Sequence, residues 1–498
     1  MWGQPDAPDG IDRRNFIKYT SLASVGAGVA GCSSDGSGDG GGDGGDGGGG
    51  DGGGNGDGGN GGDGDGGGDG DGGNGGDGGG GGGMEDGERP VQWIGPAYSN
   101  YEEQVNKYTE VTGIELAATR NALSDVQQKV LSGGSETFDA VSLDTSTAGA
   151  VTIDNDASRA VPTENLDRWD ESKISDLFTN PSERISQIGA QTDTMEAQLW
   201  EDDARTRLKF PPTVYNFDAI GYNPKQVEPG SISEWSSLFD DQYSGEVLFD
   251  AIPAIGIPET LMHLLDNDMV DGDVGSLNDP SQDQMDAAID FLIEQKNSGQ
   301  FRSTWTAYGT SVNLMTSEDA IIGDIWQPAT LSVRRNGTPC TYATMSEGIQ
   351  GYRFWWAGIM PTKPGASQRN NVDEVAELID AHYGAWFPGF IQEFGYSVPQ
   401  YPNESLVREG SDETGQGMGP EYYDWAYRGS RTYDAVEDPY LFDPASYEWS
   451  MEEGDPSSDG QQRDSGPIED RIDRISFFQI WPSNADYMLD RWSEFKSA

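Results

Sequence analysis

The chain holds few histidines and cysteines, two residue types that often carry catalysis or ligate metals. Its two histidines, His263 and His382, stand far apart and in no dyad or metal-ligand spacing, and its two cysteines are Cys32 and Cys340. No G-x-S-x-G, H-E-x-x-H or phosphate-cradling loop occurs in the part expected to fold. Trp, Tyr and acids are abundant instead, and they suit noncovalent binding. We therefore expect no enzymatic activity, no cofactor and no metal site.

The N-terminal segment IDRRNFIKYTSLASVGAGVAGCSS has the features of an export signal. The apolar run from Tyr19 to Gly31 is too short and too rich in Gly and Ser to span a hydrocarbon core, which needs about 20 apolar residues. D-R-R-N-F-I-K, with Arg13 and Arg14, resembles a twin-arginine export signal, and V-A-G-C resembles the lipobox whose cysteine is acylated. We predict that residues 1–32 are the signal, that Cys32 carries lipid and that the protein is anchored at the extracellular face of the membrane.

Residues 33–88 are predicted to form a disordered tether. From Gly36 to Gly83 the segment is almost wholly Gly with interspersed Asp and Asn, so it has little apolar surface to bury and much backbone entropy to lose. A Gly-rich chain of roughly 50 residues has a mean reach of about 40 Å. Such a length would hold a folded part away from the lipid while keeping it near a membrane partner.

The net charge of −56, from 30 Lys and Arg against 86 Asp and Glu, limits the classes of partner. Repulsion from phosphates excludes nucleic acid and anionic lipid surfaces. Such self-repulsion would destabilise a compact state in dilute buffer, whereas multimolar salt shortens the Debye length to about 3 Å. The composition therefore indicates adaptation to high salt.

The segment after Arg89 begins with alternating strand and helix patterns. Ser99 and Glu102 predict a capping box for a helix that ends at Gly113. Strands are expected at Val91–Gly95, Ile114–Ala118 and 138–143, and a second helix at Ser124–Leu131. This alternation predicts a parallel α/β sheet with right-handed crossovers. Ligands of such sheets bind beyond the carboxyl ends of the strands, here at the loops 95–99 and 144–147.

Ordered tracts along the chain carry a family resemblance. They are V-T-G-I-E-L, F-D-A-V-S-L-D-T-S, I-G-Y-N-P-K-Q-V, I-S-E-W-S-S-L-F-D, Y-S-G-E-V-L-F-D, L-M-T-S-E-D-A-I-I-G-D-I-W and E-F-G-Y-S-V-P. From Val91 to about Asn403 the chain resembles the extracellular solute-binding proteins of ABC importers, in particular the spermidine/putrescine-binding branch. Residues 404–498 depart from the family through acidic insertions.

The resemblance implies a two-lobed type II periplasmic-binding-protein fold of the α/β class with an interlobe cleft. The chain would cross between lobes near Phe210–Tyr215 and return near Phe354–Met360. The expected division is lobe 1 at 89–212, lobe 2 at 213–353, a return to lobe 1 at 354–403, and an acidic C-terminal segment at 404–498 that packs on the lobes. The implied partners of this monomer are a small solute and a membrane permease.

The resemblance also implies which residues contact the solute. These are Tyr98, Asp144, Ser146, Asp250, Trp326 and Trp356. Asp250 matches a carboxylate that binds an ammonium group, but the sequence D-A-I-P-A lacks the second acid that follows it in polyamine receptors, and Trp356 stands where they carry another acid. Because an unpaired buried ammonium costs several kcal/mol, a monocation, a zwitterion or a neutral solute is favoured over a polyamine.

Other interpretations stay open at the level of sequence. Trp355 and Trp356 could pack in a core, Asp144 and Asp250 could be surface acids, and the acids of 266–273 are read as a solvated surface and not as a calcium loop. The alternative function is a secreted carbohydrate-active hydrolase, because paired carboxylates about 5 to 10 Å apart suffice for glycoside hydrolysis. A structural cell-surface protein would need no cleft.

Overall fold

A computed structural model describes residues 90–133, 137–363, 371–384, 386–392, 394–411, 415–416, 419–429, 463 and 466–498. The predictions for Arg13, Arg14, Cys32 and the tether lie outside the described residues. Within the described part, no helix is both long enough and apolar enough to cross a membrane.

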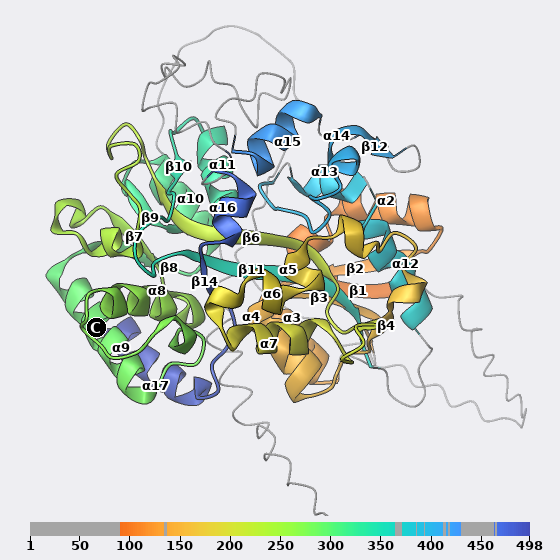
Figure 1. The fold of residues 1–498 in the computed structure, drawn as a ribbon, viewed down its shortest axis with the longest axis horizontal. Coiled ribbons are helices and arrows are strands. Elements are labelled where there is room, and N and C mark those ends of the chain that lie inside the picture. Colours follow the sequence, from red (N-terminus) through yellow and green to blue (C-terminus); the bar gives the residue numbers. More distant parts are fainter. Residues whose placement is uncertain are drawn as a thin grey trace, which may run out of the picture. The chain divides into compact units, whose positions relative to one another are not determined.

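The described residues are built around a ten-stranded sheet (Figure 1). Its order is β2-β1-β3-β11-β6-β9-β7-β8, with β10 paired to β6 and β14 paired to β11. The strands are β1 Val91–Gly95, β2 Leu116–Arg120, β3 Ala140–Asp144, β6 Pro212–Tyr222, β7 Val247–Asp250, β8 Phe301–Trp305, β9 Ile322–Ile325, β10 Thr341–Tyr342, β11 Tyr352–Pro361 and β14 Ile475–Phe478. Two small ladders pair β4 Val161–Pro162 with β5 Arg207–Leu208, and β12 Gly410–Ser411 with β13 Gly415–Gln416.

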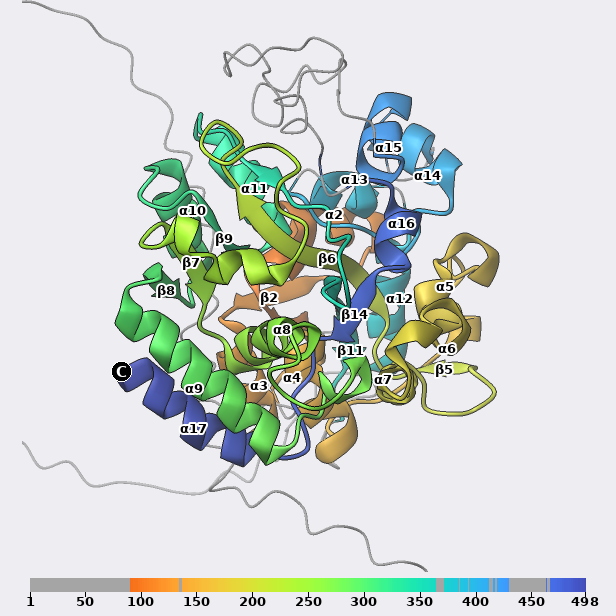
Figure 2. The same ribbon diagram turned by 60° about the vertical axis from the view of Figure 1, so that its left-hand side comes forward.

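Helices lie around the sheet (Figure 2). They are α2 Glu102–Thr112, α3 Leu123–Leu131, α4 Thr145–Gly149, α5 Asp176–Thr179, α6 Pro181–Arg184, α7 Gln191–Leu199, α8 Pro253–Asp266, α9 Gln282–Ser298, α10 Tyr308–Thr316, α11 Gln327–Arg335, α12 Val372–His382, α13 Trp386–Gln392, α14 Glu404–Glu409, α15 Pro420–Tyr427, α16 Ile468–Ile472 and α17 Ala485–Ser497.

The sheet is mixed, whereas the sequence predicted a parallel one. The parallel part is confirmed where β1 pairs with β2 and β3. The long strands β6 and β11 then run antiparallel to each other, and β11 also runs antiparallel to β3. β6 pairs with β11 through its first residues and with β9 through Ala219–Tyr222, so one continuous strand connects the two halves of the sheet. The segments expected to cross between lobes lie in or next to these two strands.

The N-terminal elements follow the predicted order with local differences. β1 has the predicted bounds, and Gly113 ends α2 in the left-handed region with φ 71°. The capping box at Ser99 is wrong, because Tyr101 is the N-cap residue and its backbone N–H donates to Oε1 of Gln104 at 2.8 Å. Ser99 lies in a preceding turn and donates to the carbonyl of Pro96. β2 begins at Leu116, two residues later than expected.

The C-terminal residues complete the fold. β14 adds to the edge of β11, and α17 packs along α9 in both ribbon views (Figures 1 and 2). Trp492 of α17 is buried, and its indole N–H donates to the carbonyl of Ala251 at 3.0 Å. The chain thus passes from a strand at the centre of the sheet to a helix on the β7 and β9 half.

Candidate functional site

Two predicted site residues stand together where β3 ends. Asp144 is the last residue of β3, and its carboxylate accepts hydrogen bonds from the hydroxyl of Ser146 at 2.9 Å and from the backbone N–H of Thr147 at 3.0 Å. Burial raises the pKa of Asp144, and these hydrogen bonds and Arg353 counteract part of the shift. Asp144 is therefore a buried acid at a strand end, not a surface acid.

Tyr98 lies near Asp144 at the end of β1. Burial, and then the Asp144 carboxyl, raises the pKa of the Tyr98 phenol well above its ordinary value. Its hydroxyl is buried and has no hydrogen-bond partner among the described residues. The Tyr98 ring lies 5.6 Å from that of Tyr396, which in turn lies 6.2 Å from Trp355 in an edge contact. These three rings form an aromatic group beside the carboxyl ends of β1 and β3.

A second group lies at the carboxyl ends of β7 and β9. Asp250 ends β7 and is fully buried. Its Oδ2 accepts a hydrogen bond from Nε1 of Trp326 at 2.9 Å, and its Oδ1 accepts one from the backbone of Ile252. The Trp326 ring lies 5.2 Å from Trp305 and 6.3 Å from Tyr308. The fold therefore joins Asp250 and Trp326, two predicted site residues that are 76 positions apart.

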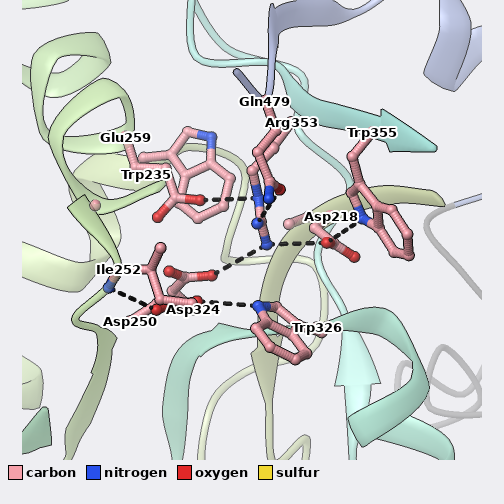
Figure 3. Close-up of polar contacts among 12 residues, drawn as sticks. Asp218, Trp235, Asp250, Ile252, Glu259, Asp324, Trp326, Arg353, Trp355 and Gln479 are labelled. Carbon is pink, nitrogen blue, oxygen red and sulfur yellow. Dashed lines mark hydrogen bonds and ion pairs between the residues drawn. The ribbon is translucent and has the colours of Figure 1, made fainter. Parts of the chain in front are cut away.

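Arg353 of β11 links the two groups (Figure 3). Its Nη2 lies 2.9 Å from Oδ2 of Asp218, and that same oxygen accepts from the indole of Trp355 at 2.8 Å. Its Nε lies 3.4 Å from Oε1 of Glu259, Nη2 lies 4.0 Å from Oδ1 of Asp324, and Nη1 donates to Gln479 at 2.8 Å.

We call the five residues Asp218, Asp250, Glu259, Asp324 and Arg353 the acid cluster. Each has at most 1 % of its surface exposed. Burial raises the pKa of Asp250 well above its ordinary value, Asp324 raises it further, and Arg353 lowers it. Burial likewise raises the pKa of Glu259 well above its ordinary value, and Asp324 raises it further.

A single guanidinium cannot neutralise four ionised carboxylates. Buried carboxyls in this arrangement hold protons unless another cation enters the cluster. Burial opposes the charge of Arg353, but the surrounding acids outweigh it and raise the pKa of the guanidinium. The cluster is therefore electrostatically suited to a cation and unsuited to an anion.

Trp356 lies away from the other five predicted residues. Side chains alternate along β11, so Arg353 and Trp355 both reach Asp218 while Phe354 and Trp356 point to the opposite face. The Trp356 ring is fully buried, stacks on Phe478 at 4.8 Å and packs against Phe178 and Phe210.

The residues that sequence reasoning missed at this site are Trp355, Arg353, Asp218, Glu259 and Asp324. The available sequence signal for Arg353 and Trp355 was the alternation of side chains along a strand. In the sequence R-F-W-W, this alternation places Arg353 and Trp355 on one face and Phe354 and Trp356 on the other. No sequence signal places Glu259 of α8 beside Asp324 of β9. Only the packing of α8 on the sheet does so.

The remaining residues named from the sequence are structural or exposed. His382 is buried against Tyr108 at 4.4 Å, and burial lowers its pKa to about 3. Asp266, Asp268, Asp271 and Asp273 are exposed. Among the described residues, no group of three or more His, Cys, Asp or Glu is placed to hold a metal ion. A cavity of about 550 Å³ opens next to Ser146.

Comparison with known proteins places the fold. No protein-family model matches the sequence, and no curated protein matches it. A Listeria monocytogenes protein assigned as a spermidine/putrescine ABC transporter superposes with a TM-score of 0.53 at 14% identity, covering 82% of this chain and 97% of its own.

Two further solved structures are similar at lower scores. The spermidine/putrescine substrate-binding protein PotD of Streptococcus pneumoniae has a TM-score of 0.49 at 15% identity and covers 82% of this chain and 99% of its own. The binding protein MotA of A. tumefaciens, in complex with glucopine, has a TM-score of 0.48 at 10% identity and covers 82% and 100%. The likeness to the Listeria monocytogenes protein shows that the described chain has the two-lobed α/β fold of periplasmic binding proteins.

Proposed function

We propose that this protein is the solute-binding component of an ABC import system and that it captures a small amine-bearing solute between its two lobes. The observation that carries the proposal is the acid cluster, which lies between two groups of aromatic side chains at the carboxyl ends of strands from both halves of the sheet. In open α/β sheets this is where ligands bind.

The charge of the cluster favours a cation. Four buried acids surround one arginine. Its nitrogens Nη2, Nε and Nη1 contact Asp218, Glu259 and Gln479 respectively. Arg353 therefore has little capacity left for a solute carboxylate. An ammonium near Asp250 would find a carboxylate together with the face of Trp326, where a cation–π contact contributes about 0.5 to 2 kcal/mol.

The cluster also supplies further acids near Asp250, where the sequence D-A-I-P-A lacks the second acid of polyamine receptors. Glu259 and Asp324 lie near Asp250 in space although neither follows it directly in the sequence. A solute with two ammonium groups is therefore compatible with the charge available. Of the predicted contacts, Tyr98, Asp144, Ser146, Asp250 and Trp326 belong to this proposal, whereas Trp356 is covered by other rings.

Closure of the lobes would follow from motion about β6 and β11, and it requires that the solute bind the closed state more tightly than the open state.

We further propose that the protein is exported through the twin-arginine signal at Arg13 and Arg14, is anchored through lipid on Cys32 and delivers the unchanged solute to a permease as a monomer. The ion pairs of Asp218, Glu259 and Asp324 with Arg353 support the binding role over the alternative of a glycoside hydrolase.

The test is thermal stability of the full chain in multimolar KCl with amines, amino acids, sugars and organic anions. We expect amines to raise the melting temperature and organic anions to leave it unchanged. Asp250→Asn should weaken amine binding at least tenfold, while Asp268→Asn, which changes an exposed acid, should not. Stabilisation by organic anions alone, or by no compound at all, would contradict the proposal.

A further inference from the structure

The cavity next to Ser146 separates two walls that belong to different halves of the fold. One wall comes from α4, residues 153–155 and α7, and Nε2 of Gln198 in α7 donates to the carbonyl of Thr145, directly after β3, at 3.4 Å. The opposite wall includes residues 275–279, which connect α8 to α9 and so belong to the half that contains β7 (Figure 1). A motion about β6 and β11 would therefore change the distance between the two walls.

Gln191, the first residue of α7, bridges the two halves at the edge of this cavity. Its side chain is only 3 % exposed. Its Nε2 donates to the carbonyl of Val274, just before the opposite wall, at 3.0 Å and to the carbonyl of Ser476 in β14 at 3.3 Å. Its Oε1 accepts from the backbone N–H of Phe478, also in β14, at 3.0 Å. The amide thus uses its nitrogen and its oxygen together, which fixes its orientation.

Asn278 of the opposite wall bonds to the same residue of β14. Its Oδ1 accepts from the backbone N–H of Phe478 at 2.9 Å, and its Nδ2 donates to the carbonyl of Phe478. One backbone N–H is therefore shared between a side-chain amide from each half of the fold. We call Gln191 and Asn278, together with the backbone groups of Val274, Ser476 and Phe478, the amide clasp.

Within the described part of the chain, Gln191 is the only residue of α7 whose side chain bonds to residues 274–279. The other hydrogen-bonded side chains of this helix, Thr192, Glu196 and Gln198, bond to residues on their own side of the cavity. Beyond the clasp the walls diverge into the cavity of about 550 Å³. The polar link between the walls is thus a few neutral hydrogen bonds. Water can replace such bonds at little net cost, which suits a contact that forms and breaks.

We propose that Gln191 is a conformational latch between the two halves: its bond to Val274 holds them at the separation seen here and breaks when they move apart about β6 and β11. The bond from Nε2 to Val274 forms only at this separation. Removing the amide therefore shifts the equilibrium toward wider separations.

The inference rests on the proposed function only for its effect on the solute. The acid cluster at the strand ends is at most 1 % exposed, so the separation seen here is the closed one. A solute that binds the closed state would bind less tightly when the latch is lost, because a smaller fraction of the protein is then competent to bind.

The test measures the distance between the halves by double electron–electron resonance on the full chain in multimolar KCl. Nitroxides are attached at Ala197→Cys on α7 and at Glu294→Cys on α9, two exposed positions on opposite halves. Cys32→Ser removes the other reactive thiol, and Cys340 is buried. The two labels then report directly on the separation of the halves.

Three variants are compared in this labelled background. Gln191→Leu removes the amide, and Gln191→Glu keeps the size of the side chain but removes its N–H donors. Gln187→Leu is the matched control, because Nε2 of Gln187 donates to the carbonyl of Ile472 at 3.0 Å and makes no bond to residues 274–279. The control therefore loosens a contact near β14 without touching the link between the halves.

We expect the same main distance in the labelled parent and in Gln187→Leu. Both Gln191 variants should show at least a threefold larger population of longer distances, and every protein should keep a cooperative thermal transition. Distances in Gln191→Leu identical to those of the parent, or equally long distances in Gln187→Leu, would overturn the inference. Loss of the cooperative transition in both Gln191 variants would also overturn it, because Gln191 would then be needed for folding.

The proposed function fails separately. An amine that stabilises the wild type should bind Gln191→Leu more weakly, by the factor by which the population of the short distance falls. Longer distances in Gln191→Leu, without stabilisation of the wild type by any amine, would support the latch and contradict the receptor function. An amine bound equally by both proteins, with unchanged distances, would leave the receptor function standing and remove the latch.

Discussion

Replacing Arg353 with Met tests whether the acid cluster depends on its one guanidinium. Arg353 is 1 % exposed, lies 2.9 Å from Asp218 and 3.4 Å from Glu259, and is the cation shared by four buried acids. Removing one partner of a buried ion pair leaves uncompensated charge and costs about 3 to 5 kcal/mol. We expect Arg353→Met to lower the free energy of unfolding by about that amount at neutral pH.

The loss should depend on pH in a defined direction. The pKa values of Asp218, Asp250, Glu259 and Asp324 are all raised in the folded protein, so these acids contribute stability that is present below their unfolded pKa values and lost as pH rises through the folded ones. Without Arg353 the folded pKa values rise further. The destabilisation of Arg353→Met should therefore shrink as pH falls toward 4.

Urea unfolding at fixed multimolar KCl, followed by fluorescence from pH 4 to 8, measures both effects. Arg302→Met is the control, because Arg302 pairs with Asp319 at the surface and such pairs contribute about 0 to 1 kcal/mol. Asp218→Asn added to Arg353→Met should restore part of the loss, since it removes the carboxylate left unpaired. An effect no larger than that of Arg302→Met, or one that grows as pH falls, would refute the reasoning.

Three more predictions concern single groups and the solvent. Because burial and Asp324 raise the pKa of Glu259, wild-type stability is lost as pH rises, and Glu259→Gln should be more stable than the wild type at pH 8 by about 1 kcal/mol or more, with no advantage near pH 4 in urea titrations. His382, whose pKa burial lowers to about 3, should stay neutral, and its ring NMR shifts should be constant from pH 5 to 8; a titration in that range would contradict its burial. Trp326→Leu should weaken amine binding by about 0.5 to 2 kcal/mol in calorimetry, and unchanged affinity would remove Trp326 from the site. With a net charge of −56, the protein should lose its cooperative thermal transition in dilute buffer and regain it in multimolar KCl, and full stability at low ionic strength would count against salt adaptation.

Local patterns predicted the elements well where the signal lay in neighbouring residues. The apolar run of β1 and the glycine that ends α2 were located from composition alone, because strand burial and left-handed helix termination depend on the residue itself. The N-cap of α2 was misplaced. Ser99 stands three residues before Glu102, and Tyr101 stands three residues before Gln104, so the spacing of a capping box fits both pairs. The backbone of the folded chain forms the box at Tyr101. The antiparallel pairing of β6 with β11 was not predicted, because about 140 residues separate the two strands along the chain.

The candidate site was also predicted in part from the sequence. A resemblance of ordered tracts pointed to Tyr98, Asp144, Ser146, Asp250 and Trp326, and the structure sets Asp144 against Ser146 and Asp250 against Trp326. Along β11 the same approach selected Trp356, one residue away from the face that carries Arg353 and Trp355. A shift of one residue in a strand exchanges the two faces, and gapped alignment cannot resolve it when two tryptophans are adjacent.

By itself, the sequence determined the acidic character of the protein, the order of its first strands and helices, and the scarcity of histidine and cysteine, because each of these depends on composition or on near neighbours. Tertiary structure alone decided that Glu259, Asp324 and Asp218 surround Arg353 and that Asp250 lies against Trp326. These groups come from elements far apart in the chain, and the interactions among buried charges act through space over a few ångströms, whatever the separation in sequence.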